Sequence, residues 1–282
     1  MLTLTAQSPT ELLTHLRSVE IAVLARTEGR TPQHCERWSI CRFLGSYANE
    51  KHLQFPLELI HRERPPSPDF ELRLGNLIVG VEVTEATHRD YAWAKALAAK
   101  IPGALLEPCM FIPGSQIQRG SGVRPRIGRI QRQLVGRGWR GLEMERTWVQ
   151  FVMDAVDDKT HHLGSQSFHR FDEDWLLIYD NTPCTPRKGL FIEKAAPMLR
   201  DQLETYWNRE PHFVAIFVET GGTIVELTCD ALRSLPVIDV SLHHGTLRNT
   251  AIPSASLQDL DCDSRSPTGN HGARSTGTSS PR

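Results

Sequence analysis

The chain has 282 residues, of which 39% are hydrophobic and 23% charged, and its formal net charge is -1. This composition is typical of an ordinary soluble protein with one substantial core. Neither a membrane span nor a signal peptide is expected, because no apolar stretch approaches 18 residues and the N-terminus lacks a basic region before an apolar run. The sequence also has no phosphate-binding GxxxxGK[ST] loop, no nucleophile-elbow pattern and no internal repeat. These absences exclude P-loop proteins, α/β-hydrolases and repeat proteins.

The cysteines are scattered and form no CxxC pair. They are typical of reduced thiols, so we expect a cytoplasmic protein. His34, Cys35 and Cys41 lie close together, but no second ligand pair follows at zinc-finger spacing, so a structural zinc is not expected.

Two helices are predicted before the first long hydrophobic alternation. Residues 8–28 open with Ser8-Pro9-Thr10-Glu11, a capping box with proline at the first helical position, and an apolar stripe follows at helical spacing. Residues 33–54 predict a second helix, and Pro56 then interrupts the chain before a short turn at Leu57–Arg62.

A β-hairpin is predicted between Pro68 and Thr84. Gly75-Asn76 suits a two-residue turn, and counting outward from it pairs Phe70 with Val81 and Asp69 with Glu82. One face then collects seven apolar residues (Phe70, Leu72, Leu74, Leu77, Val79, Val81 and Val83), as expected for the face that packs on a core.

The other face of the hairpin places two carboxylates opposite each other. Residues paired in this way have Cβ atoms about 5 Å apart, so Asp69 and Glu82 repel unless a cation lies between them or one is protonated. Oxygen ligands of this kind suit Mg²⁺ or Mn²⁺. Gly80 predicts open space beside Glu82. The alternative interpretation is that Asp69 belongs to a turn and Glu82 merely faces solvent.

The segment Pro68-Asp69, the hairpin, and then Glu82-Val83-Thr84 resemble the PD-(D/E)XK phosphodiesterase superfamily over about 17 residues. The resemblance implies that Asp69 and Glu82 bind the metal ion, that the Val83 carbonyl completes its coordination, and that the residue two places after Glu82 activates water. Family members usually carry lysine there, whereas this chain has Thr84. In the family a preceding helix often adds an acidic residue; Glu50 and Glu58 are the candidates, and Glu50 is preferred. The alternative for each is a solvated acid.

A lysine from elsewhere, either Lys95 or Lys159, would have to replace the missing ammonium. Residues 85–100 predict an alanine-rich helix that carries Lys95 just beyond the carboxylates. Lys95 would direct its ammonium toward a bound phosphate or water; the alternative is a solvated surface residue. Residues 104–112 then predict a third core strand, at an edge or with a bulge because of Pro108.

Residues 113–147 have a different composition, rich in arginine and glycine. They hold eight arginines against two glutamates, a net charge of +6 in a chain of net charge -1. Arginine binds phosphate bidentately and Trp139 offers a stacking surface, so this segment predicts a nucleic-acid partner. A solvated basic loop is the alternative. The predicted contact residues are Arg119, Arg124, Arg126, Arg129 and Arg132.

The C-terminal half alternates helices and apolar strands. Residues 143–163 predict a helix whose Lys159 resembles a lysine that many superfamily relatives carry before the next core strand; we assign it to nucleic-acid binding. Strands are expected at 174–180, 213–218 and 223–227, and a helix kinked at Pro197 at 191–209.

Together these elements predict an α/β fold with a mixed central β-sheet flanked by helices, as in the restriction-endonuclease-like core that the resemblance implies. Residues 1–250 would form a single domain with the arginine-rich segment as an insertion, and 251–282, which are rich in Ser, Thr, Gly, Pro and Arg, a disordered tail.

The sequence therefore predicts a nuclease that needs Mg²⁺ or Mn²⁺ and cleaves DNA or RNA. Asp69, Glu82, Thr84 and Lys95 are the expected catalytic residues, and Asp69, Glu82, Val83 and Glu50 the expected metal ligands. Two alternatives stay open. The chain either keeps the fold as a nucleic-acid-binding or interaction module without catalysis, or it uses the hairpin only structurally in an α/β protein of unrelated function.

Overall fold

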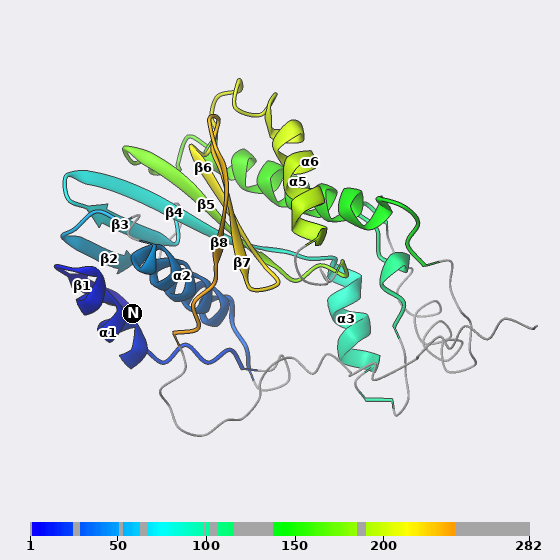
Figure 1. Cartoon of the computed structure of the whole chain (residues 1–282), viewed down its shortest axis with the longest axis horizontal. Coiled ribbons are helices and arrows are strands. Elements are labelled where there is room, and N and C mark those ends of the chain that lie inside the picture. The colour runs from blue at the N-terminus through cyan, green and yellow to red at the C-terminus, as the bar shows by residue number, and fades with distance from the viewer. Residues whose placement is uncertain are drawn as a thin grey trace, which may run out of the picture. The chain divides into compact units, whose positions relative to one another are not determined.

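The computed structural model describes residues 2–24, 29–50, 53–62, 67–98, 100–101, 106–115, 138–184 and 190–240. All of these belong to one compact unit, Met1–His243. Within them, eight strands form one sheet and helices cover it (Figure 1). The helices are α1 (Pro9–Ser18), α2 (Pro32–Asn49), α3 (Arg89–Ala98), α5 (Glu143–Leu163) and α6 (Leu190–Leu203).

The strands lie in the sheet in the order in which they occur in the chain. They are β1 (Thr3–Ala6), β2 (Leu57–His61), β3 (Phe70–Leu74), β4 (Leu77–Ala86), β5 (Glu173–Asp180), β6 (Ala215–Thr220), β7 (Thr223–Leu227) and β8 (Leu232–Pro236). Strands β4, β5 and β6 are parallel to one another, and all other neighbours are antiparallel. The sheet is therefore mixed, which confirms the predicted α/β class.

Each face of the sheet packs on its own hydrophobic core. Val79, Val81 and Val83 of β4 pack with buried residues of α1 and α2, whereas Leu176 and Ile178 of β5 pack with those of α5 and α6. Figure 1 shows the two pairs of helices on opposite sides of the strands. Strand β4 thus lies between two layers of helices. In the described part of the chain, no helix combines the length and the apolar character that crossing a membrane requires.

The predicted hairpin is confirmed with its register. Leu74 pairs with Leu77, and Phe70 with Val81. Gly75 has φ of 61°, a left-handed conformation that glycine adopts without strain. The seven apolar residues of its predicted buried face all belong to the α1–α2 core or pack against it.

The first helix is shorter than predicted. The Ser8 side chain accepts a hydrogen bond from the Glu11 backbone N–H, which confirms Ser8 as the N-cap, but Glu11 accepts from the N–H of Gln7 and not from that of Ser8, so the predicted capping box is only half formed. The helix ends at Ser18, because Val19 is extended (φ -79°, ψ 131°). Val19 and Ile21 still contact the core. The apolar stripe therefore continued past the helix into an extended segment.

Several other boundaries differ from the predictions. Residues 57–61 form β2, not a turn, because alternate residues face the core. Helix α3 begins at Arg89, since β4 continues to Ala86 alongside β5. The third core strand predicted at 104–112 is wrong for the described residues 106–112, where Pro108–Met110 form a short 3₁₀ turn. The short outer strands β1 and β8 were not predicted.

The C-terminal half follows the prediction more closely. Helix α5 has the predicted bounds, and β5 and β7 match the predicted strands. Helix α6 contains Pro197 as expected but ends at Leu203. The predicted tail at 251–282 lies outside the described residues, and so does most of the arginine-rich segment.

Candidate functional site

The candidate site lies where β4 extends beyond the start of β3. The β3–β4 ladder ends with the pair Phe70 and Val81, and Asp69 directly precedes β3. From there the Asp69 carboxylate reaches β4: its Oδ2 accepts a hydrogen bond from the Val83 backbone N–H at 2.8 Å. The hairpin therefore brings Asp69 beside Glu82 and Val83, as its predicted register requires.

Glu82 points toward the α5 side of the sheet. Lys159, on α5, donates a hydrogen bond from its Nζ to Glu82 Oε1 at 2.5 Å. The Glu82 side chain is only 11% exposed and that of Lys159 only 19%, so this ion pair is largely removed from water. A charged hydrogen bond of this kind holds both groups in a defined place.

Burial disfavours the charged forms of both carboxyls. It raises the pKa of Asp69 from 3.8 to about 6; the nearby charge of Glu36 raises it as well, whereas the Val83 N–H and the Lys159 ammonium lower it. Burial also raises the pKa of Glu82, and the charge of Asp69 adds to that rise, while Lys159 opposes it. The two acids thus share a poorly solvated region in which one ammonium does not balance both charges.

A third acid, Glu36, lies near this pair and was missed by the sequence analysis. It occupies the first turns of α2, and its pKa is raised by burial and by the charge of Glu82 but lowered by that of Lys159. His61 Nε2 lies 3.7 Å from Glu36 Oε2. Acids occur at both ends of α2, so the direction of the helix decides which of them approaches the hairpin.

The preferred helical acid, Glu50, lies at the other end of α2. It is the C-cap residue, about 21 Å along the helix axis from Glu36, and its Oε1 accepts a hydrogen bond from Asn49. The other candidate, Glu58, lies on β2, where it pairs with Arg73 at 2.9 Å. The structure thus brings Glu36, not Glu50, to the pair of carboxylates.

The ammonium at the site comes from Lys159. Thr84 follows Glu82 by two residues on the same face of β4 and lines a neighbouring cavity. Lys95 lies on α3, beyond the end of β4, whereas Lys159 contacts Glu82 directly. From the sequence, Lys159 was assigned to nucleic-acid binding and was also named, with Lys95, as a candidate source of the missing ammonium; its hydrogen bond to Glu82 brings it to the two acids. The signal that pointed to it was its position on the helix before β5.

The space above Gly80 is filled. A Cβ at this position would lie 2.7 Å from the Phe171 ring and 2.9 Å from Asp174 Oδ1. This corrects the expectation of open space beside Glu82. Glycine is needed here because the segment that leads into β5 packs directly onto the β4 backbone.

The donor set suits a hard divalent cation. Among the described residues, no group of three or more His, Cys, Asp or Glu side chains is arranged to hold a metal ion. Mg²⁺, however, is commonly bound through one or two carboxylates and keeps several waters. Asp69 and Glu82 fit that pattern, and a cation there would offset the burial and the neighbouring negative charges that raise the pKa of both. The Val83 carbonyl remains a predicted ligand.

The predicted nucleic-acid contacts lie outside the described residues, since Arg119, Arg124, Arg126, Arg129 and Arg132 all belong to 116–137. The described site therefore consists of Glu36, Asp69, Glu82 and Lys159. Comparison of the chain with protein-family models, curated proteins and solved structures gives no match in any of the three.

Proposed function

We propose that the chain is a divalent-metal-dependent phosphodiesterase that cleaves DNA or RNA and has a restriction-endonuclease-like core of the PD-(D/E)XK kind. One observation carries the proposal: two carboxyls with raised pKa values, the half-buried Asp69 and the buried Glu82, lie side by side with an ammonium hydrogen-bonded to one of them. Perturbed titratable groups in such a cluster are typical of catalytic sites.

Each residue has a role in this proposal. Asp69 and Glu82 hold Mg²⁺ or Mn²⁺, and Glu36 adds negative charge from α2. When bound, the ion polarises a phosphoryl oxygen and lowers the pKa of a coordinated water. Lys159 would take the part of the missing motif lysine: its ammonium, held beside Glu82, would orient the attacking water and stabilise negative charge at the phosphate. Thr84 offers a neutral hydrogen bond only.

The mixed sheet supports the same proposal. Glu82 lies in the carboxyl half of β4, four residues before its end at Ala86, within the run of parallel strands β4, β5 and β6. In open α/β sheets, ligands bind outside the carboxyl ends of parallel strands. The arginine-rich segment would bind the nucleic-acid backbone, so binding should weaken as salt rises.

The test is cleavage of single- and double-stranded DNA and RNA by the full chain with Mg²⁺, with Mn²⁺ or with EDTA. Asp69→Asn and Glu82→Gln should each abolish metal-dependent cleavage, because each removes a ligand charge. Asp157→Asn, an exposed substitution on α5, should have no effect. A chain that binds nucleic acid but cuts none under any condition, with the acid variants binding alike, would instead be a non-catalytic binding module.

A further inference from the structure

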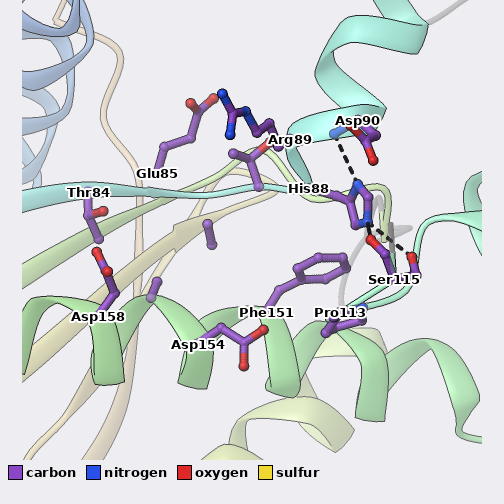
Figure 2. Close-up of a pocket in the computed structure, with 14 residues that line it drawn as sticks. Thr84, Glu85, His88, Arg89, Asp90, Pro113, Ser115, Phe151, Asp154 and Asp158 are labelled. Carbon is purple, nitrogen blue, oxygen red and sulfur yellow. Dashed lines mark hydrogen bonds between the residues drawn. The ribbon is translucent and has the colours of Figure 1, made fainter. Parts of the chain in front are cut away.

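A second feature lies beside the proposed catalytic cluster. A cavity of 630 Å³ opens between the end of β4, the start of α3, the loop at 113–115 and the face of α5 that carries Asp154 and Asp158. Figure 2 shows Thr84 and Glu85 on the β4 side of this cavity and Asp154 and Asp158 on the α5 side. Its volume falls within the range of about 300–1,000 Å³ that is usual for pockets that bind small organic groups.

The cavity adjoins the catalytic cluster at two points. Thr84 follows Glu82 on the same face of β4, and Asp158 precedes Lys159 on α5. The Asp158 carboxylate points toward Thr84 (Figure 2), and its charge also raises the pKa of Lys159. A group bound in the cavity would therefore lie next to a phosphate held at Glu82 and Lys159.

The wall formed by His88 is fixed by hydrogen bonds. Its Nδ1 faces the backbone N–H groups of Asp90 and Tyr91 at 3.2 and 3.3 Å and must accept, so Nε2 carries the proton and donates to the Ser115 carbonyl at 3.0 Å. His88 is thus a rigid, neutral part of the wall and holds the 113–115 loop against α3.

The polar lining selects against phosphate. Four acidic residues line the cavity against one arginine, Arg89, so it repels anions; the acids are Glu85, Asp90, Asp154 and Asp158. Two of them already have partners, since Asp154 accepts from Gln150 and Glu85 accepts from Asn181. Asp158, at the side nearest Lys159, is the acceptor placed to meet a ligand.

Part of the remaining lining is apolar and suits a flat ring. Ala86, Pro113, Phe151 and Ala155 supply this part, beside the hydroxyl-bearing side chains of Thr84, Thr87 and Ser115. A pocket of this size that combines apolar side chains with hydrogen-bond acceptors fits an uncharged ring with N–H donors better than it fits a single ion or a phosphate. Among the groups that adjoin a phosphodiester, the nucleobase has this chemistry.

We propose that this cavity binds the base next to the scissile phosphate and that Asp158 selects a base with an exocyclic amino group, namely cytosine, adenine or guanine. This inference rests on the proposed nuclease function. A carboxylate accepts a hydrogen bond from an amino group, such as N4 of cytosine, whereas uracil and thymine present a carbonyl oxygen at the equivalent position and repel it.

Cytosine and uracil provide the sharpest comparison, because they differ mainly in the amino or carbonyl group that Asp158 would meet. We would measure the rate of metal-dependent cleavage of single-stranded oligonucleotides that carry either base beside a unique cleavage site. Wild type should favour cytosine about tenfold, the size expected for one hydrogen bond to a charged group. Asp158→Asn, whose amide can also donate, should lose or reverse that preference.

The ratio between the two bases is the readout, because it is insensitive to any effect of Asp158 on Lys159 and hence on the overall rate. Asp157→Asn, the neighbouring substitution outside the cavity lining, should keep the preference. Equal cleavage of both bases by wild type, or an unchanged preference in Asp158→Asn, would overturn the inference while leaving the nuclease function standing.

If wild type cuts no substrate, the proposed function fails, and the cavity is then tested by binding alone. Titration of the full chain with cytidine and with uridine should show tighter binding of cytidine, and Asp158→Asn should remove the difference. Absence of cytidine binding, or equal binding of the two nucleosides, would overturn the inference in that case as well.

Discussion

Asp69→Asn should make the metal-free protein more stable while it abolishes the proposed activity. Burial raises the pKa of Asp69 from 3.8 to about 6, so its ionised form is unfavourable in the folded state. The amide of asparagine has nearly the same shape but no charge. Its oxygen can still accept the hydrogen bond that the Val83 N–H donates at 2.8 Å. The substitution therefore removes the unfavourable charge and keeps the contact.

The sign and size of the effect follow from proton linkage. Between pH 3.8 and about 6 the folded state binds more protons at Asp69 than the unfolded state does, so stability falls as the pH rises through this window. Above about pH 6, ionisation of Asp69 lowers the free energy of unfolding by its full amount, at most about 3 kcal/mol. Asp69→Asn should thus raise the free energy of unfolding by about 1–3 kcal/mol at pH 7.5 and by almost nothing near pH 3.5.

The assay is urea unfolding in EDTA at both pH values, with Asp157→Asn as the exposed control. Added Mg²⁺ should reverse the order, because it binds and stabilises the folded wild type but not the variant. If Asp69→Asn is less stable than wild type at pH 7.5 without metal, the carboxylate is not held in an unfavourable place, and the argument for a cation site fails.

Three further predictions concern the groups around this acid. Lys159→Met should lower the cleavage rate at least a hundredfold. It should also destabilise the metal-free protein by about 2 kcal/mol at neutral pH, since Glu82 stays buried without the Lys159 ammonium. The control variant Lys95→Met should cleave at the wild-type rate. Glu36→Gln should raise the metal concentration needed for half-maximal cleavage about tenfold, because it removes a negative charge near the acids, while Glu50→Gln should leave that concentration unchanged. Equal effects of the two substitutions would contradict the placement of Glu36. Gly80→Ala should lower the free energy of unfolding, measured by thermal unfolding, by about 2 kcal/mol, because its Cβ would lie 2.7 Å from the half-buried ring of Phe171. A variant as stable as wild type would show that the segment before β5 shifts at little cost.

The hairpin was predictable because its determinants are local. Gly75-Asn76 marks the turn, and strict alternation sets which side chains face the core. Asp69 and Glu82 are brought together by this short-range register alone. The predicted helix at 143–163 is likewise correct, because its long apolar stripe has one period throughout.

The rest of the site depends on packing between distant segments. Lys159 and Glu82 are 77 residues apart, and only the packing of α5 on the sheet shows that they meet. The choice between Glu36 and Glu50 depends on the direction in which α2 crosses the sheet, which helix periodicity does not encode. The strands β1 and β8 are short, so their local signal is weak; they pair because the sheet offers them an edge.

The groups of the site come from both helical layers. Glu36 belongs to α2, which packs on one face of the sheet, and Lys159 to α5, which packs on the other, while Asp69 and Glu82 belong to the hairpin between them. A graft of the hairpin onto another scaffold would therefore carry the recognisable sequence signature without its cation or its third acid. The smallest transplantable unit runs from α2 to α5, and a search for related proteins by the hairpin alone would retrieve many that lack the full set of site residues.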